Sequence, residues 1–328
     1  MQLARRHRIE PLAARALAAR SPRHLTPAED HLATAAQRTL AQNLRYAAEA
    51  KRLLTHFQAL GLSPLFVKGL TLSKLAYGNI ALKQGWDIDM LVAQHEAVKA
   101  CGALLELGYD CTLPGPVRRA QQLSRWCDRS REVIWHHARR GVYLELHTRL
   151  VDNPLLIPGI DAAGPRRLVN ITTGVALPTL GDEELFSYLC VHGASSCWFR
   201  LKWLADLAKL LQHKEAVDIE TLYRRSQQLG AGRAADQALL LCRFLFKTNI
   251  PPGLWRHLRS SRVNRMLLCL ALGLLDPVDP NTELYDRPFG TLPIHFAQFL
   301  LMPGWRFKWM ELHAQVSSIW RGVRWKPT

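Results

Sequence analysis

The sequence predicts an α+β protein, in which a mixed sheet over residues 61–150 is flanked by an N-terminal helical segment, 1–60, and a C-terminal helical domain, 151–328. Short apolar runs separated by glycine turns predict the strands of the sheet. Apolar residues at helical spacing predict helices before and after it. With 328 residues and 48% apolar composition, the chain is long enough to bury a substantial core.

A long helix is predicted to begin after Thr26 and to continue to residue 60. Thr26 is a suitable N-cap, Pro27 takes the first helical position, and Glu29 completes a capping box. Residues 31–60 contain neither proline nor glycine. We expect the apolar residues of this helix to pack against the sheet.

Residues 65–92 are predicted to form a strand, a glycine turn, a short helix and a second strand. The first strand leads into Lys68 and Gly69, where the absence of a side chain lets the backbone turn sharply and approach a ligand. The helix is expected over residues 70–77, and Gly78 ends it.

The second strand carries Asp87 and Asp89. Alternate residues of a strand share a face, so these carboxylates point the same way, roughly 7 Å apart at the backbone. Ile88 and Met90 then point into a core. Two neighbouring carboxylates repel each other, and burying them unpaired is costly. A divalent cation removes that cost, and Mg²⁺ prefers oxygen ligands. The alternative is an exposed strand face with two solvated aspartates.

A third carboxylate is predicted on a later strand, residues 142–148, where Glu145 and His147 share a face. Residues 133–137 are the expected hairpin partner, with 138–141 as the turn. Three carboxylates on neighbouring strands can hold two metal ions roughly 3.5–4 Å apart, an arrangement that stabilises both ends of a phosphoryl displacement.

Together these motifs resemble the nucleotidyltransferase fold of the DNA polymerase β superfamily. More narrowly, they are similar to a bacterial nucleotidyltransferase family with the pattern L-K-G, then D-I-D-L-L-V, then D/E-x-H. The matching motifs are Lys68-Gly69, Asp87-Ile88-Asp89-Met90-Leu91-Val92 and Leu144-Glu145-Leu146-His147. A later helical stretch with Glu183, His192, Trp198, Arg200, Lys202, Trp203 and Asp206 also fits, so the resemblance covers about residues 30–275.

The resemblance implies an enzyme that moves a nucleoside monophosphate from an NTP to an acceptor hydroxyl or phosphate. It implies that Asp87, Asp89 and Glu145 are the catalytic residues and bind Mg²⁺ in a two-ion site, which Mn²⁺ would also fill. The residues expected to contact the nucleotide or the acceptor are Lys68, Gly69, Lys83, His147, His192, Lys202 and Asp206. Lys83 stands where the family often has an arginine, and Cys197 where it usually has a second histidine.

Some of these residues have simpler interpretations. A lone helical histidine such as His192 is commonly a partly buried packing residue, and Lys202 and Asp206, four residues apart, can form an ion pair. A group of five arginines either binds phosphates or forms a solvated face, and we favour the solvated face. The group comprises Arg118, Arg119, Arg125, Arg129 and Arg131.

The formal net charge of +16 favours anionic partners, although an arginine-rich composition accounts for it equally well. Two further functions therefore stay open. One is a non-catalytic nucleotide-binding sensor or antitoxin-like module, and the other is an RNA-directed nucleotidyltransferase. The acceptor is a saccharide, a peptide, a small molecule or RNA, and the sequence does not distinguish them.

Composition predicts a soluble cytoplasmic protein. The seven cysteines are scattered without a C-x-x-C motif, which argues against a disulfide framework, and the histidines lack the paired spacing of a zinc site. The longest apolar run, residues 266–275, is about half of the ~20 residues needed to span a bilayer. The arginine-rich N-terminus has no apolar segment of the kind found in secretory signals.

Residues 151–178 are rich in proline and glycine and are predicted to be a connector. The predicted helices beyond it span residues 183–192, 195–212, 218–229, 233–247 and 262–275. The segment 230–235 has the G-x-G-x-x-A pattern of a dinucleotide site, but it follows a helix and therefore predicts a helix break.

The C-terminal stretch, residues 305–325, carries an apolar stripe at helical spacing with basic residues around it. The stripe comprises Trp305, Trp309, Leu312, Val316, Ile319, Trp320 and Val323, and the basic residues are Arg306, Lys308, Arg321, Arg324 and Lys326. Such a helix either contacts an anionic lipid surface or nucleic acid, or is the last helix of the core, and we favour the core helix.

Overall fold

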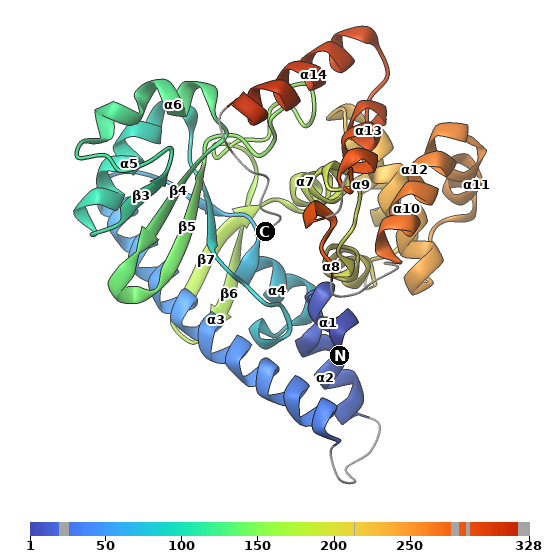
Figure 1. Cartoon of the computed structure of the whole chain (residues 1–328), viewed down its shortest axis with the longest axis horizontal. Helices are drawn as coiled ribbons and strands as arrows, with labels where there is room; N and C mark the ends of the chain where they lie inside the picture. Colours follow the sequence, from blue (N-terminus) through green and yellow to red (C-terminus); the bar gives the residue numbers. More distant parts are fainter. Residues whose placement is uncertain (20–25, 213, 277–281, 287–288, 321–328) are drawn as a thin grey trace. The chain divides into compact units, whose positions relative to one another are not determined.

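The computed structural model describes residues 1–19, 26–212, 214–276, 282–286 and 289–320 of the chain (Figure 1). The chain forms two compact units, each built from segments that are separate in the sequence. The first, which we call the sheet unit, comprises Pro11–Asp152 and Gly159–Gly181. The second, the helical unit, comprises Met1–Glu10, Asn153–Pro158 and Asp182–Thr328.

The sheet unit is organised around a mixed five-stranded sheet in the order β1-β2-β5-β4-β3. β2 and β5 are parallel, and the other neighbouring strands are antiparallel. The strands are β1 (Leu65–Phe66), β2 (Ile88–Leu91), β3 (Asp110–Leu113), β4 (Glu132–His137) and β5 (Val142–His147). This sheet confirms the α+β prediction, and the expected hairpin of β4 and β5 is present.

One face of the sheet is apolar and packs with two helices of the unit. Met90 of β2 and Leu144 of β5 belong to a buried core that includes residues of α3 and α5. The predicted capping box at the start of α3 is confirmed, since the Thr26 N–H donates to Glu29 Oε2 at 2.7 Å and the Glu29 N–H donates to Thr26 Oγ1.

The helices assigned to this unit are short apart from α3. They are α2 (Glu10–Ala18), whose first residue belongs to the helical unit, α3 (Pro27–Ala59), α4 (Gly69–Tyr77), α5 (Ala97–Glu106) and α6 (Ser124–Arg129). The 3-10 turns are η1 (Ile80–Leu82), η2 (Gln94–Glu96), η3 (Ala120–Leu123) and η4 (Ala138–Arg140).

The predicted connector over residues 151–178 is corrected by the structure, because it contains a β-hairpin. The strands β6 (Arg166–Thr172) and β7 (Val175–Leu180) are antiparallel and turn at Gly174, which has a φ of 71°. Ile171 and Leu177 join the same buried core as the sheet. The proline and glycine content that predicted a connector therefore belongs to the turns and to a half-buried position of β7, Pro178.

The helical unit contains helices α1 (Gln2–Arg6), α7 (Asp182–Ser195), α8 (Leu201–Leu211), α9 (Ala216–Gln228), α10 (Gly232–Phe246), α11 (Pro252–Ser260), α12 (Arg262–Leu275), α13 (Leu292–Leu300) and α14 (Trp305–Trp320), with the 3-10 turn η5 (Leu284–Asp286). The sequence predicted α12 and the break before α10 correctly, but it gave no signal that we recognised for α11.

The helix predicted over residues 195–212 begins only at Leu201. Cys197 and Trp198 have φ values of 47° and 54°, so the chain leaves the helical path there. The ring of Trp198 is fully buried against Gly193 of α7. The break between α7 and α8 is the local conformation that brings this ring into the core of the helical unit.

The apolar stripe of α14 does not form core, which corrects the interpretation that we favoured. Trp305 and Trp309 are 77% and 59% exposed, whereas Phe307 is buried. The side chains of Ile319 and Trp320, and residues 321–328 with the predicted Arg321, Val323, Arg324 and Lys326, lie outside the described residues. Among the helices that the structure describes, none has both the length and the apolarity that crossing a bilayer requires.

Candidate functional site

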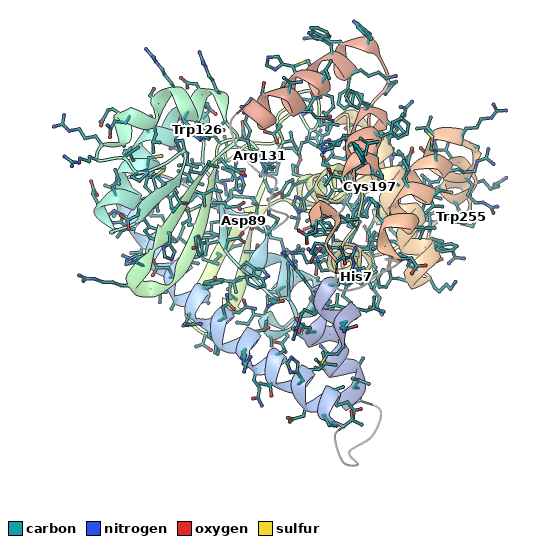
Figure 2. All side chains as sticks on the ribbon, viewed as in Figure 1. His7, Asp89, Trp126, Arg131, Cys197 and Trp255 are labelled. Carbon is teal, nitrogen blue, oxygen red and sulfur yellow. The ribbon has the colours of Figure 1, made fainter. Side chains whose placement is uncertain are left out.

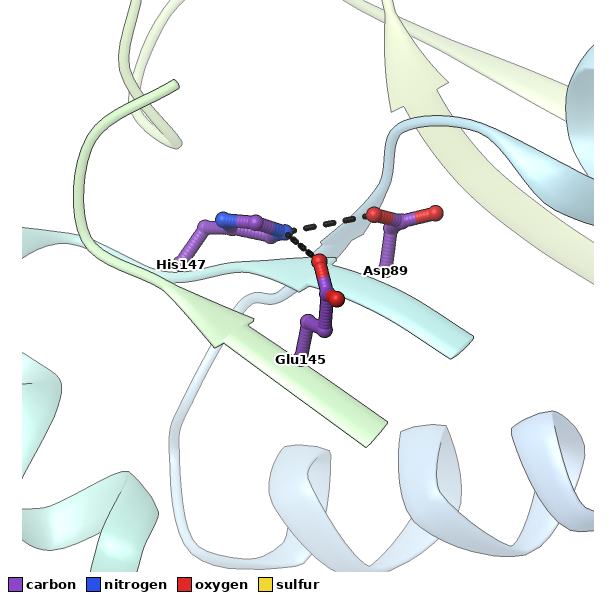
Figure 3. Close-up of side chains that lie close together, drawn as sticks. All are labelled: Asp89, Glu145 and His147. Atoms are coloured by element: carbon purple, nitrogen blue, oxygen red, sulfur yellow. Dashed lines mark hydrogen bonds and ion pairs between the residues drawn. The ribbon is translucent and has the colours of Figure 1, made fainter. Parts of the chain in front are cut away.

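The candidate site lies where β2 and β5 run side by side in the sheet unit. Their parallel register places Asp89 opposite Glu145 and Leu91 opposite His147. Because side chains alternate along a strand, Asp89, Glu145 and His147 share the face opposite the apolar core. Residues that are far apart in the sequence therefore converge on one face of the sheet (Figure 3).

Asp89, Glu145 and His147 form a compact group of possible metal ligands. One ligand atom of each lies within 4.8 Å of the others, and all three residues are buried. Figure 3 shows the His147 ring directed toward both carboxylates. Its Nε2 lies 3.2 Å from Asp89 Oδ1 and 3.4 Å from Glu145 Oε2.

Lys68 neutralises Asp89 from the adjacent glycine turn. Its Nζ lies 2.6 Å from Asp89 Oδ1. β1 is antiparallel to β2, and the Val67 N–H donates to the Asp89 carbonyl at 3.2 Å, so the turn that follows β1 lies beside the carboxylate. Gly69 has a φ of 56°, in the left-handed region that favours glycine, and begins α4. The Thr71 hydroxyl closes the turn by donating to the carbonyl of Lys68 at 3.0 Å.

Glu132 of β4 contacts the other side of the His147 ring. The β4–β5 register places Glu132 opposite His147, and Glu132 Oε2 lies 3.5 Å from His147 Nδ1. Arg131, labelled in Figure 2, pairs with Glu132 at 3.1 Å. Glu132 was not among the site residues predicted from the sequence. The predicted turn at 138–141 contained the necessary signal, because it fixes the hairpin register and therefore the residue opposite His147.

The charges of the site perturb one another strongly. Burial alone would raise the pKa of Asp89, but the Lys68 ammonium and His147 together hold that pKa well below its usual range. Burial would lower the pKa of His147, but hydrogen bonds to Asp89 and Glu145 and the charge of Glu132 raise it to about 9. Burial opposes ionisation of Glu132 too, and Arg131 and His147 lower its pKa. The metal-free site therefore contains carboxylates neutralised by three cationic groups, Lys68, His147 and Arg131.

This donor set fits a divalent cation. Asp89 and Glu145 supply hard oxygen ligands, and His147 supplies a nitrogen ligand that many divalent metals accept. The Lys68 ammonium at 2.6 Å from Asp89 occupies the position of a counter-charge, which indicates that this carboxylate attracts cations. A metal ion bound by His147 requires its neutral imidazole, so binding would release a proton.

Asp87 lies beside this cluster, and Lys83 stands four residues before Asp87 in the chain. Asp87 precedes β2, is half-buried and lines a small pocket together with Lys68, Gly69 and Asp89. It is not one of the three residues whose ligand atoms lie within 4.8 Å of one another. Lys83 ends η1, and its carbonyl accepts a hydrogen bond from Asn43 Nδ2 at 2.8 Å.

A family model of uncharacterised nucleotidyltransferases matches residues 1–247. The chain belongs to this family. Its membership agrees with the nucleotidyltransferase resemblance expected from the sequence. Comparison with the curated proteins finds no match. A nucleotidyltransferase family implies a nucleotide substrate.

Three candidate contact residues lie on helices of the helical unit, within the part that the family model matches. His192 of α7 packs against the rings of Tyr188 and Trp203, at centroid distances of 5.8 and 5.6 Å. Lys202 of α8 lies over the Trp203 ring, and Asp206, one turn later, is buried. These packing contacts agree with the simpler interpretation of His192, and a role in substrate binding stays a prediction for all three.

The five arginines between residues 118 and 131 divide into two groups. Arg118, Arg119, Arg125 and Arg129 are exposed, as expected of a solvated face. Arg131 is half-buried and pairs with Glu132 and, at 3.6 Å, with Asp152. Arg131 therefore supports the carboxylate that contacts His147.

Proposed function

We propose that this member of the family is a Mg²⁺-dependent nucleotidyltransferase that moves a nucleoside monophosphate from an NTP to an acceptor hydroxyl or phosphate. The observation that carries the proposal is the convergence of Asp89, Glu145 and His147 beside the Lys68-Gly69 turn. Family membership supplies the reaction class. The acceptor is a saccharide, a peptide, a small molecule or RNA.

Asp87, Asp89 and Glu145 are the proposed metal ligands, with Mg²⁺ in a two-ion site and Mn²⁺ as a substitute. Bound there, the cation would polarise the phosphoryl oxygens and lower the pKa of the acceptor hydroxyl. Asp89 and Glu145 already face each other across β2 and β5. Asp87 lies at the entrance to β2, where it lines the same pocket as Asp89.

The glycine turn is the proposed phosphate-binding element. Backbone N–H groups in the first turn of a helix lack intrahelical partners and bind phosphate oxygens. Gly69 begins α4 and carries no side chain that would keep a phosphate away. Lys68 exchanges the Asp89 carboxylate for a phosphate oxygen when nucleotide binds, and Lys83 adds a second positive charge.

Glu145 is the proposed base that accepts the acceptor's proton, and His147 orients it. Glu132 Oε2 lies 3.5 Å from the opposite nitrogen of the His147 ring, and Nε2 lies on the side of Glu145 and Asp89. His192, Lys202 and Asp206 are proposed contacts to the nucleotide or the acceptor on the basis of the family pattern.

Titration calorimetry with Mg²⁺ or Mn²⁺ and each NTP, followed by a pyrophosphate-release assay with lysate as the source of acceptor, tests the proposal. We expect metal-dependent binding of at least one NTP, and pyrophosphate release that Asp89→Asn and Glu145→Gln abolish. Asp110→Asn is the matched control, because Asp110 is an exposed aspartate of β3. Labelled NTP and mass spectrometry of the lysate would then identify the acceptor.

Two other experimental results would indicate a different function. Tight metal-dependent NTP binding without turnover in any lysate would indicate a nucleotide sensor or antitoxin-like module. Turnover that requires RNA and falls steeply with salt would indicate the RNA-directed enzyme that the net charge of +16 also suits. Failure of every NTP to bind in the presence of metal would contradict all three of these nucleotide-based functions.

A further inference from the structure

The last described helix of the chain exposes a continuous apolar stripe. Trp305, Trp309, Leu312 and Val316 of α14 are all exposed, and their spacing of four, three and four residues places them on one helical face. The Trp305 and Trp309 rings lie next to each other, with a centroid distance of 6.5 Å. The stripe therefore presents two indole rings followed by two aliphatic side chains.

The opposite side of α14 holds the helix on the helical unit. Phe307 is buried, and Glu311 accepts a hydrogen bond from Asn153 Nδ2 at 2.9 Å. Gln315 Nε2 donates to Gln298 Oε1 of α13 at 2.9 Å. Because these contacts already fix the helix, the exposed stripe is not needed for packing within the described residues of this unit.

The charges of α14 are arranged around the stripe. At about 100° per residue, Arg306 and Lys308 fall on opposite sides of the Trp305–Trp309 face. Glu311 is the only acidic residue in the sequence of α14, and it lies on the buried side. The sequence after the helix, residues 321–328, adds two arginines and a lysine and no acidic residue. The exposed face of α14 is thus apolar along its centre and basic at its margins.

We propose that the exposed face of α14 docks on the surface of an anionic lipid bilayer. A helix with an apolar stripe and basic margins lies in the plane of the interface, where the stripe enters the acyl boundary and the cations meet the headgroups. Indole rings favour this interfacial depth. Leu312 and Val316 provide no flat face for a nucleobase, so the stripe suits lipid better than single-stranded nucleic acid. The proposal is independent of the catalytic one.

Co-sedimentation of the full chain with vesicles tests this docking. We expect binding to vesicles of phosphatidylcholine with phosphatidylglycerol, weak binding to phosphatidylcholine alone, and a decrease with salt. The double variant Trp305→Ala/Trp309→Ala should lower the partition coefficient about tenfold or more, because the apolar contribution is removed. Arg306→Gln/Lys308→Gln should lower binding to the anionic vesicles and leave binding to neutral ones unchanged. Phe244→Ala is the matched control, an exposed aromatic of α10.

Each remaining outcome overturns the proposal. Absence of binding by the native chain to anionic vesicles at low salt does so, as does a double variant that binds like the native chain. Retention on single-stranded RNA that the double variant loses, without vesicle binding, would identify nucleic acid as the occupant. A dimer that the double variant converts to a monomer, again without vesicle binding, would identify a second copy of this chain. Unchanged circular dichroism melting of the variants confirms that they are folded.

Discussion

At the scale of single residues, the candidate site is a buried set of opposite charges that depend on one another. Asp89 accepts from both Lys68 and His147, and His147 lies between carboxylates on its two nitrogens. Removing one member of a buried ion pair costs more than the pair contributes, because the partner charge stays desolvated. Asp89 is the member whose loss leaves two cations facing each other.

Asp89→Asn is therefore expected to destabilise the metal-free protein by about 3 kcal/mol. The substitution keeps the shape of the side chain and removes the charge that both Lys68 and His147 need. Urea unfolding at neutral pH in the presence of a chelator measures the effect. Asp110→Asn, on the exposed side of β3, should change the free energy of unfolding by no more than about 0.5 kcal/mol. Equal effects of the two substitutions would contradict the assignment of Asp89 as the centre of the buried charges.

His7 of the helical unit (Figure 2) is expected to make the stability of the protein depend on pH. Burial, followed by the charges of Arg6 and Arg200, lowers its pKa, and its Nδ1 accepts a hydrogen bond from the Leu201 N–H at 3.3 Å. In the unfolded chain His7 binds a proton near pH 6.5, whereas the folded chain resists protonation to lower pH. The contribution of His7 to the free energy of unfolding is therefore fully present above pH 6.5, and it decreases as the pH falls below that value.

His7→Asn keeps an acceptor for Leu201 and removes the titrating group. We expect the free energy of unfolding of the native chain to fall more steeply between pH 7 and 5 than that of the variant, measured by urea unfolding at several pH values. Parallel pH profiles for the two proteins would show that His7 does not contribute to the acid sensitivity.

The sequence indicated which site residues share a face and placed them on neighbouring strands, but it did not give the register between those strands. The alternation of Asp89 with Met90, and of Glu145 with Leu146, gave the polar and apolar faces correctly. The parallel register of β2 and β5 depends on contacts between segments far apart in the sequence, and a local pattern does not encode it. The ion pair of Lys68 with Asp89 follows from that tertiary arrangement and was missed for the same reason.

At the scale of secondary-structure elements, single glycines and tryptophans decide where the helices end. The pattern over 195–212 looks continuous, but the burial of Trp198 interrupts it, because the ring needs the space beside Gly193. The β6–β7 hairpin was likewise hidden, since Pro178 and Gly174 are usual in loops. Local propensity gave the type of most elements, and the tertiary packing of one large side chain overrode it here.

Gly193→Ala is expected to destabilise the protein by about 1–3 kcal/mol. A Cβ at this position would lie 2.3 Å from a Trp198 ring atom. The ring is held by a hydrogen bond from Trp198 Nε1 to Gln237 Oε1 at 3.2 Å, so moving it breaks a second contact. The matched control is Gly253→Ala in α11, where no described atom comes within 4 Å of the added Cβ, and which should leave stability unchanged or raised. Urea unfolding of both variants measures these effects. An unchanged free energy of unfolding for Gly193→Ala would contradict the tight packing of Trp198 against Gly193.

At the scale of the whole molecule, the two units do not follow the sequence in simple blocks. The sheet unit takes its hairpin from Gly159–Gly181, and the helical unit takes its first segment from Met1–Glu10. The sequence-based boundary at residue 150 is therefore a prediction that fragments of the chain can test. A boundary there separates β6 and β7 from the core that their apolar residues share with the sheet.

We expect a fragment of residues 11–181 to unfold cooperatively in urea, and a fragment of residues 11–150 to lose this cooperativity and bind a hydrophobic dye. The shorter fragment lacks Ile171 and Leu177, both buried in the core of the sheet unit, and removing them exposes the apolar surface that they cover. In the full chain, Leu177→Ala should cost about 2–5 kcal/mol, whereas Leu168→Ala should be close to neutral, because Leu168 is 66% exposed on the same hairpin. Cooperative unfolding of the shorter fragment, together with a neutral Leu177→Ala, would show that the hairpin is dispensable and that the domain boundary lies at residue 150.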